Sequence, residues 1–249
     1  MPFGLCNAVS SFQRLADCVL SGMPCVFVYI DDVLIFSDSE EQHAQDVRAV
    51  LQRLREAGLS VNPDKSRFFQ KEVEFLGHRI TPAGVFPLPK RLDALTSFPS
   101  PTDRTSLLRF VGSLNFYRQF LPGAAGLLRP LTRLLKKDVE WEWGPDQVAA
   151  FEAARKAVSE ASALAFYQSG APLRLSVDAS DVAIGAVLEQ EQDGAYVPLG
   201  FFSRHYSPAE ERYSTFDREL LACYSSVHYF RHLLEGNKFQ LRSDHRPVC

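Results

Sequence analysis

Two adjacent aspartates, Asp31 and Asp32, stand in the middle of the apolar run VFVYIDDVLIF, which covers residues 26–36. Only this pair separates two short β-forming stretches, so the sequence predicts a hairpin with the aspartates at its bend. A two-residue hairpin turn needs positive backbone φ angles and therefore favours Asn-Gly or Asp-Gly. Turn chemistry alone gives no reason for two neighbouring acids.

Apolar residues on both faces of this run predict a hairpin that is buried on both sides. Two buried carboxylates repel each other and lose their hydration, and a crowded carboxylate tends to remain protonated. A divalent cation would allow both to stay ionised, and Mg²⁺ commonly binds one or two carboxylates together with substrate phosphates. The pair therefore favours a metal site for phosphoryl transfer, and a turn without a metal is the alternative.

The rest of the chain predicts helices followed by a mixed domain of order β-β-β-α-β. Apolar spacing marks the helices, and the one over 41–57 is expected to direct Val47, Leu51 and Leu54 inward. Asp193-Gly194 is a strong hairpin turn signal in the mixed domain. The expected elements are helices from Asn7 to about Val19 and over 41–57, 102–123, 126–137 and 146–161, a hairpin around 81–84, strands over 173–178, 184–190, 196–204 and 238–244, and a helix from Ser214 to about Leu234.

Charge is distributed unevenly although the net charge is only −3. Residues 90–137 carry 9 basic and 2 acidic side chains, whereas 1–89 carry 8 and 11 and 138–249 carry 10 and 17. A cationic segment of this kind is typical of a surface that binds the phosphate backbone of a nucleic acid. The alternative is a solvated helical face that has no partner.

A second set of acids lies in the last third of the chain. Asp178 ends a predicted strand, Glu219 lies in the first turns of the predicted helix, and Asp244 ends the fourth strand. Three acids from three elements could converge at one end of a sheet, as two-metal phosphodiester hydrolysis requires. The alternative is that the aspartates are polar strand ends and that Glu219 only favours the N-terminus of its helix.

The cysteines and the apolar runs bear on the compartment. The five cysteines are odd in number and form no C-x-x-C pair, which favours a reducing compartment over a disulfide framework or a zinc ribbon. No apolar run approaches the roughly 20 residues of a membrane span, and the N-terminus does not have the form of a secretory signal. We therefore expect an intracellular protein, cytoplasmic or nuclear, that is not secreted and has no membrane partner.

The motif Tyr29-Ile30-Asp31-Asp32 resembles the Y-x-D-D signature of reverse transcriptases, and its surroundings resemble the polymerase of Gypsy-class LTR retrotransposons. MPFGLCNA with Phe12-Gln13-Arg14 is similar to the segment that precedes Y-x-D-D in that family. The other similar blocks are Phe75-Leu76-Gly77-His78, which looks like the primer grip, and Leu108–Gly112 with Asn115–Arg118, which look like the helix of the thumb and connection.

The DAS, RELLA and SDH motifs around Asp178, Glu219 and Asp244 resemble the ribonuclease H domain that follows this polymerase. The resemblance implies an α+β fold with a partial palm over 1–89, a cationic helical thumb and connection over 90–137, a helical connection over 138–170 and an incomplete RNase H-like domain over 171–249. It implies catalytic metal ligands at Asp31, Asp32, Asp178, Glu219 and Asp244, and we expect nucleic-acid contacts at Phe75, Leu76, Gly77, His78, Arg104, Arg109 and Arg118.

The resemblance implies an RNA-directed DNA polymerase with ribonuclease H activity that uses Mg²⁺ or Mn²⁺. Its substrates would be an RNA or DNA template with its primer and deoxynucleoside triphosphates, and the parent element's virus-like particle would be a cytoplasmic site. In the family a third polymerase aspartate and the fingers lie upstream, and a fourth RNase H acid lies downstream, so we expect a truncated chain. The alternatives are a catalytically dead remnant that at most binds nucleic acid or a protein partner, and a host metal-dependent phosphohydrolase. No oligomeric state is predicted.

Overall fold

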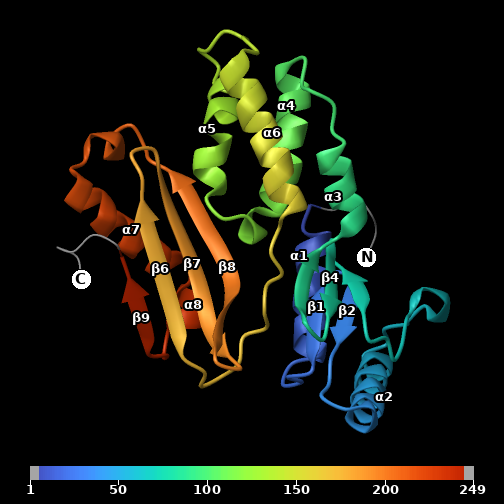
Figure 1. The fold of residues 1–249 in the computed structure, drawn as a ribbon. Helices are drawn as coiled ribbons and strands as arrows, with labels where there is room; N and C mark the ends of the chain where they lie inside the picture. Colours follow the sequence, from blue (N-terminus) through green and yellow to red (C-terminus); the bar gives the residue numbers. More distant parts are fainter. Residues whose placement is uncertain (1–5, 244–249) are drawn as a thin grey trace. The chain divides into compact units, whose positions relative to one another are not determined.

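The computed structural model describes residues 6–243 and separates into two compact units, one up to Phe75 and one from Leu76 onward (Figure 1). The predicted α+β fold class is confirmed. No helix in the described part of the chain has both the length and the apolar character needed to cross a membrane.

The first unit is a hairpin covered by two helices. Its elements are α1 (Ala8–Val19), β1 (Val26–Tyr29), β2 (Asp32–Ile35), α2 (Glu40–Glu56), a 3-10 helix (Pro63–Lys65) and β3 (Val73–Phe75). Leu20, Val50 and Leu54 are buried against one face of the β1–β2 hairpin, and Val26, Val28 and Ile35 pack on them from the strands. The helices therefore cover one side of the hairpin.

Two sequence expectations for this unit are wrong. The bend of the hairpin is Ile30-Asp31 and not Asp31-Asp32, because Tyr29 pairs with Asp32 and the latter already belongs to β2. In α2 Val47 and Leu54 are buried as expected, but the third buried residue is Val50, whereas Leu51 is 36% exposed. Helical spacing allows either residue to face inward, and packing against Leu20 decides which one does.

The second unit begins with a hairpin and a group of helices. These are β4 (His78–Thr81), β5 (Gly84–Pro87), α3 (Pro89–Thr96), α4 (Arg104–Phe116), a 3-10 helix (Arg118–Phe120), α5 (Ala124–Leu134) and α6 (Pro145–Ser159). The helices enclose the largest described core, in which Leu107, Phe110 and Phe120 are fully buried. The expected helix over 102–123 ends early, at Phe116, because Tyr117 closes a tight turn by donating its N–H to the carbonyl of Leu114.

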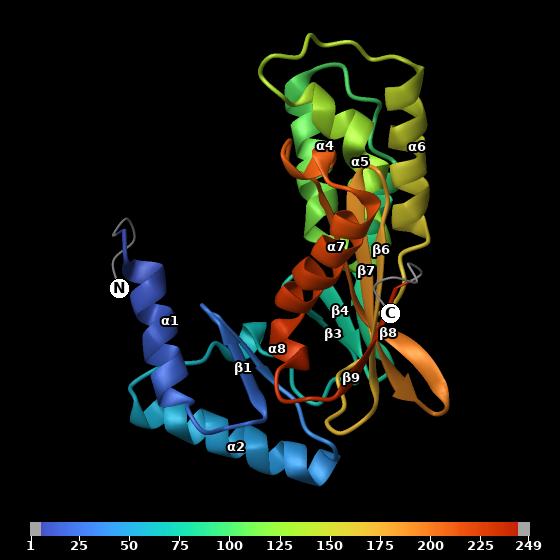
Figure 2. The same ribbon diagram turned by 90° about the vertical axis from the view of Figure 1, so that its left-hand side faces the viewer.

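A four-stranded sheet follows, in the order β8-β7-β6-β9, with β9 parallel to β6 and the other pairs antiparallel. Its elements are β6 (Leu173–Ala179), β7 (Ala183–Gln192), β8 (Ala195–His205), α7 (Thr215–Tyr229), α8 (Arg231–Leu234) and β9 (Phe239–Arg242). Figure 2 shows α7 across one face of this sheet, where Cys223 and Phe230 pack against Leu175 and Leu188. The predicted β-β-β-α-β order is confirmed, although the expected single helix breaks at the buried Phe230 into α7 and α8.

Candidate functional site

Strand register places Asp32 on the open face of the β1–β2 hairpin. Residues paired in an antiparallel ladder share a face, so Asp32 lies on the side of Tyr29 and the Phe27–Leu34 pair. Tyr29 is 49% exposed and Phe27 is 50% exposed, whereas Val26 and Val28 on the other face pack into the core. Asp31 occupies the bend itself, so the two carboxylates occupy the tip of the hairpin and the start of β2.

The prediction that these aspartates are buried is wrong, because both are exposed in this unit. The apolar run has two apolar faces, but the helices cover only one of them within the described residues. Water can therefore reach both carboxylates in this unit. What remains of the metal prediction is an exposed pair of carboxylates on a short turn, whose oxygen atoms are the ligands that hard divalent cations prefer.

The second set of acids is partly placed. Asp178 is the penultimate residue of β6 and is exposed, and Glu219 is the fifth residue of α7 and is only 3% exposed. Ser243, directly after β9, donates a hydrogen bond from Oγ to Glu219 Oε2 over 3.3 Å. The ends of the neighbouring strands β6 and β9 thus meet α7 near Glu219. Asp244 lies outside the described residues.

Tyr206 lies close to both described acids of this set. Burial raises the pKa of the Tyr206 phenol, the positive charge of Arg218 opposes that shift, and the negative charges of Glu219 and Asp178 add to it. The Tyr206 hydroxyl is buried and has no hydrogen-bond partner among residues 6–243. Sequence reasoning did not single out this residue. Within the same range, no three His, Cys, Asp or Glu side chains form a group that could hold a metal ion.

Aromatic rings pack against the FLGH segment, residues 75–78. Phe75 ends the first unit and meets Phe27 edge to face, with ring centroids 5.9 Å apart. In the second unit, the Tyr117 hydroxyl donates to the carbonyl of Gly77 over 2.8 Å, and His78 stacks on Phe116 at 5.2 Å.

Gly77 has a φ of +79°, and a Cβ on it would lie 2.8 Å from the Phe116 ring. Leu76 has a φ of +45°, so two successive residues have left-handed backbone. Burial lowers the pKa of His78, which favours its neutral form. This packing fixes the shape of the Leu76–His78 turn. A nucleic-acid contact by these residues stays a prediction.

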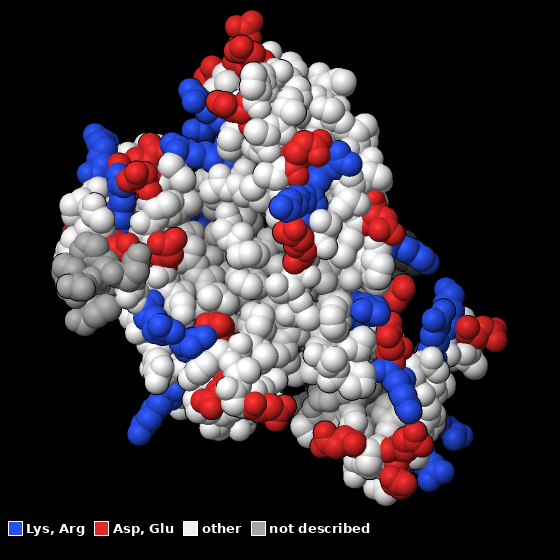
Figure 3. Space-filling model, viewed as in Figure 1, with Lys and Arg blue, Asp and Glu red and all other residues white. Residues whose placement is uncertain are grey.

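The three arginines predicted to bind nucleic acid differ in their surroundings. Arg104 donates from its guanidinium to the carbonyl of Val139, and Arg118 donates to the carbonyl and the Oγ of Ser203 in β8. Arg109 is exposed on α4. Figure 3 shows basic and acidic side chains intermixed on the face that it draws. A count of charges along the chain therefore overstates the cationic surface, because part of it binds carbonyl groups within the fold.

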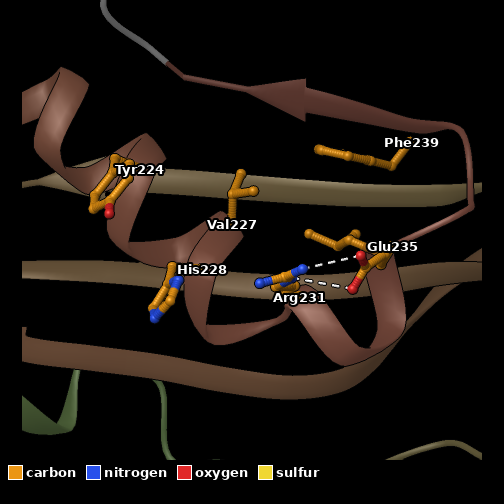
Figure 4. Close-up of a pocket in the computed structure, with 7 residues that line it drawn as sticks. Tyr224, Val227, His228, Arg231, Glu235 and Phe239 are labelled. Carbon is orange, nitrogen blue, oxygen red and sulfur yellow. Dashed lines mark hydrogen bonds and ion pairs between the residues drawn. The ribbon is translucent and has the colours of Figure 1, made fainter.

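A groove of about 320 Å³ lies between α7, α8 and the start of β9 (Figure 4). Tyr224, Val227, Leu234 and Phe239 line it, and an ion pair of 3.0 Å between Arg231 and Glu235 crosses its rim. Among residues 6–243, none of the predicted site residues lines the groove.

The loop after β8 is held by a bidentate ion pair whose effect should depend on pH. Arg204 donates to both oxygens of Glu210 at 2.8 and 2.9 Å, and with the N–H of Ser207 it lowers the pKa of Glu210 to about 2. A lowered carboxyl pKa stabilises the fold above the ordinary pKa of about 4.5, and that contribution disappears as the pH falls toward 2.

We therefore expect Glu210→Gln to lower the free energy of unfolding by about 1–2 kcal/mol at pH 7, because the pair is only partly shielded from water. The loss should shrink steadily as the pH approaches 2. Urea denaturation at pH 7 and at pH 3 measures both values. Glu211→Gln, next to it and half exposed, is the matched control and should change little. An equal loss at both pH values would contradict the expectation.

Comparisons with known proteins agree with these features. Residues 1–80 match the family model "Reverse transcriptase (RNA-dependent DNA polymerase)", and residues 143–241 match "RNase H-like domain found in reverse transcriptase". The Tf2-3 and Tf2-4 transposon polyproteins of Schizosaccharomyces pombe are each 38% identical to the chain over 253 residues. These matches cover all of the chain and 19% of each polyprotein, so the chain spans about a fifth of their length.

Solved structures share the fold. The foamy viral protease-reverse transcriptase dRH in complex with double-stranded DNA gives a TM-score of 0.87 at 23% identity, over 98% of this chain and 43% of that one. The foamy viral enzyme in complex with an RNA/DNA hybrid gives 0.85 at 23% identity, over 98% and 33%. The chain therefore belongs to the reverse transcriptases of transposon polyproteins, with a reverse transcriptase segment followed by an RNase H-like domain.

Proposed function

We propose that the chain is the part of a Gypsy-class LTR retrotransposon polymerase that runs from the palm into the RNase H domain. The carrying observation is the exposed acid pair Asp31 and Asp32 on a hairpin tip, inside the segment that matches reverse transcriptases. In this proposal 1–89 is palm, 90–137 is thumb and connection, 138–170 is connection and 171–249 is RNase H-like. The chemistry is phosphoryl transfer on a primer–template, by polymerisation at one centre and by cleavage of the RNA strand of a hybrid at the other.

The residues of both centres fit Mg²⁺ or Mn²⁺. Asp31 and Asp32 offer neighbouring carboxylate oxygens that water can reach, and hard divalent cations prefer such ligands. Asp178 and the buried Glu219 would hold the ion of the second centre, with Asp244 as the expected third ligand. A bound ion would neutralise charge on the phosphate oxygens. The protein's own part is to hold the carboxylates in place and to bind the nucleic acid.

The proposed substrates are an RNA or DNA template with its primer, and deoxynucleoside triphosphates. The foamy viral relatives of the fold are bound to double-stranded DNA and to an RNA/DNA hybrid, which supports duplex binding here. Exposed Arg109 on α4 is the best placed of the three predicted arginines for a phosphate contact, because the other two donate to carbonyl groups. An intracellular site, cytoplasmic or nuclear, follows from the proposed role in a retrotransposon.

The second candidate is a protein that binds the duplex without catalysis. Exposed Arg109 on α4 would serve such a protein as well as it would serve a polymerase, because a contact to a phosphate needs no metal ligand. Such a protein would bind primer–template at low salt, lose affinity steeply as salt is added, and bind equally well without Asp31.

A Mn²⁺ titration of the full chain separates the two candidates. We expect electron paramagnetic resonance to detect Mn²⁺ bound in the presence of primer–template when Asp178→Asn has removed a ligand of the second centre. In that background the double substitution Asp31→Asn/Asp32→Asn should weaken the binding by more than about tenfold, because two ligands lose their charge. Asp38→Asn, on the loop after β2, is the matched control in the same background and should leave Mn²⁺ binding unchanged. Equal occupancy with and without the double substitution would reject the polymerase centre and favour the binding protein.

A further inference from the structure

The side-chain amide of Gln13 bridges helix α1 to the end of strand β1. Its Nε2 donates to the carbonyl of Val28 over 3.1 Å, and its Oε1 accepts the backbone N–H of Ile30 over 2.6 Å. Nε2 also donates to Asp17 Oδ1 over 2.8 Å. One amide therefore holds the backbone on both sides of Tyr29, immediately before the acid pair.

The amide occupies the edge of β1 that faces away from β2. Hydrogen-bonded positions alternate along an antiparallel pair, and Cys25 is one of them, since its carbonyl accepts the N–H of Phe36. Val28 and Ile30 are therefore turned to the opposite edge. At this edge the Gln13 amide donates to the carbonyl of Val28 and accepts from the N–H of Ile30, as the backbone of a neighbouring strand would. The side chain thus takes the place of a third strand at the end of β1, where the strand becomes the turn.

The bridged backbone has an unusual conformation. Ile30 has a φ of +53°, in the left-handed region that β-branched residues rarely adopt. Such a conformation persists only where the surroundings hold it. The bond from the Ile30 N–H to Gln13 is short and reaches a different element, so it can hold the Tyr29–Ile30 peptide, directly before the turn, in this orientation.

Asp17 determines which way the amide of Gln13 points. A carboxylate accepts hydrogen bonds, so the bond at 2.8 Å keeps Nε2 on the side of Asp17 and Val28. Oε1 is then left to face the N–H of Ile30. Asp17, Gln13 and the backbone around Tyr29 therefore form one hydrogen-bond network from α1 to the turn, in which each N–H of the Gln13 amide and the N–H of Ile30 has an acceptor.

We propose that Gln13 is a positioning residue for the polymerase acid pair: it holds the Ile30-Asp31 turn so that Asp31 and Asp32 present their carboxylates in one arrangement. The expected effect of Gln13 on metal affinity rests on the proposed function, but the contact between Gln13 and Ile30 can be tested without a metal. Gln13 touches no substrate in this role and acts through the backbone of the turn.

The test compares Gln13→Met with Gln52→Met in the full chain. Methionine has a similar length and lacks both amide groups. Gln52 is the matched control, because it too is a helical glutamine that donates to an acid four residues on, Glu56, over 2.9 Å, but it lies on α2 and has no bond to the turn. Amide hydrogen exchange of Ile30, followed by NMR on isotope-labelled protein, reports the contact. Mn²⁺ affinity in the presence of primer–template reports the consequence.

We expect Gln13→Met to speed exchange at Ile30 by at least about tenfold and to weaken Mn²⁺ binding by a similar factor, while Gln52→Met changes neither. Unchanged Mn²⁺ affinity in Gln13→Met, where the wild type binds through Asp31, would overturn the proposal. If Mn²⁺ binding by the wild type does not depend on Asp31, the proposed function has failed. The hydrogen-exchange rate of Ile30 then tests the Gln13 contact alone: faster exchange in Gln13→Met supports the contact, and unchanged exchange overturns it.

A second variant covers the case in which Gln13→Met does not fold. Gln13→Glu keeps an acceptor for the N–H of Ile30 but loses the donor to Val28 and places a negative charge beside Asp17. We expect intermediate Ile30 exchange and intermediate Mn²⁺ affinity. Wild-type values for both would overturn the proposal.

Discussion

Asp178→Asn is expected to reduce Mg²⁺-dependent cleavage of a labelled RNA–DNA hybrid by the full chain to below about a hundredth of the wild-type rate. Asp178 is exposed near the end of β6, the nearly buried Glu219 lies on α7, which packs on β6 through Cys223, and both acids act on the pKa of Tyr206. The substitution keeps the size of the side chain and removes its charge, so a divalent ion would lose one ligand while the fold is preserved. Single-turnover cleavage with excess protein measures the effect.

Asp193→Asn is the control for this experiment. It makes the same chemical change in the β7–β8 turn, where Asp193 has a φ of +51° that asparagine also adopts readily. Cleavage by this variant should equal that of the wild type. Cleavage by Asp178→Asn at the wild-type rate would remove Asp178 from the centre, and a wild-type chain that cleaves at no metal concentration would favour the binding-only alternative.

The β7–β8 turn also illustrates what sequence can predict. Asp193-Gly194 specifies a two-residue turn by its own backbone preferences, and both residues have positive φ angles of +51° and +78°. The order of the sheet elements follows from similarly local signals. The position of Glu219 was predictable too, since it is in line with Cys223 and Ser226 on the uncharged stripe of α7, and all three are buried.

The errors come from interactions between distant residues. Whether Asp31 sits in a covered hairpin depends on what packs against the second apolar face, and the run itself carries no information on that. The bend lies one residue earlier than expected because Tyr29 pairs with Asp32, and the Ile30 N–H in that bend donates to Gln13, 17 positions away. The FQR motif contained the signal for this bond, but a motif does not show which backbone group its amide reaches.

The arginines also show that the sequence does not reveal which distant groups a side chain contacts. Arg118 counts as one positive charge in the cationic segment, yet its guanidinium donates to the carbonyl of Ser203, 85 positions later. The Ser203 Oγ in turn accepts the N–H of Ala125 at the start of α5. Part of the charge that suggested nucleic-acid binding therefore joins the helices to the β8 strand within the second unit.

The second large effect is expected at Gly84, where alanine should destabilise the second unit by about 3–5 kcal/mol. Gly84 has a φ of +136°, and a Cβ on it would lie 2.4 Å from the backbone oxygen of Leu164. The neighbouring Val85 exchanges two hydrogen bonds with Leu164, of 2.8 and 2.9 Å. Alanine must therefore distort the backbone and separate this bridge, and Leu164 is itself part of the helical core.

Guanidinium denaturation followed by the fluorescence of Trp141 and Trp143 measures this loss, because both indoles pack against the same core. Gly126→Ala is the matched control: Gly126 lies in α5, and a Cβ there meets no atom within 4 Å. Alanine suits a helix interior better than glycine, so this variant should be neutral or more stable by up to about 1 kcal/mol. Equal unfolding free energies for Gly84→Ala and the wild type would contradict this expectation. They would show that the bridge between Val85 and Leu164 does not hold β5, and with it the β4–β5 hairpin, against the helices.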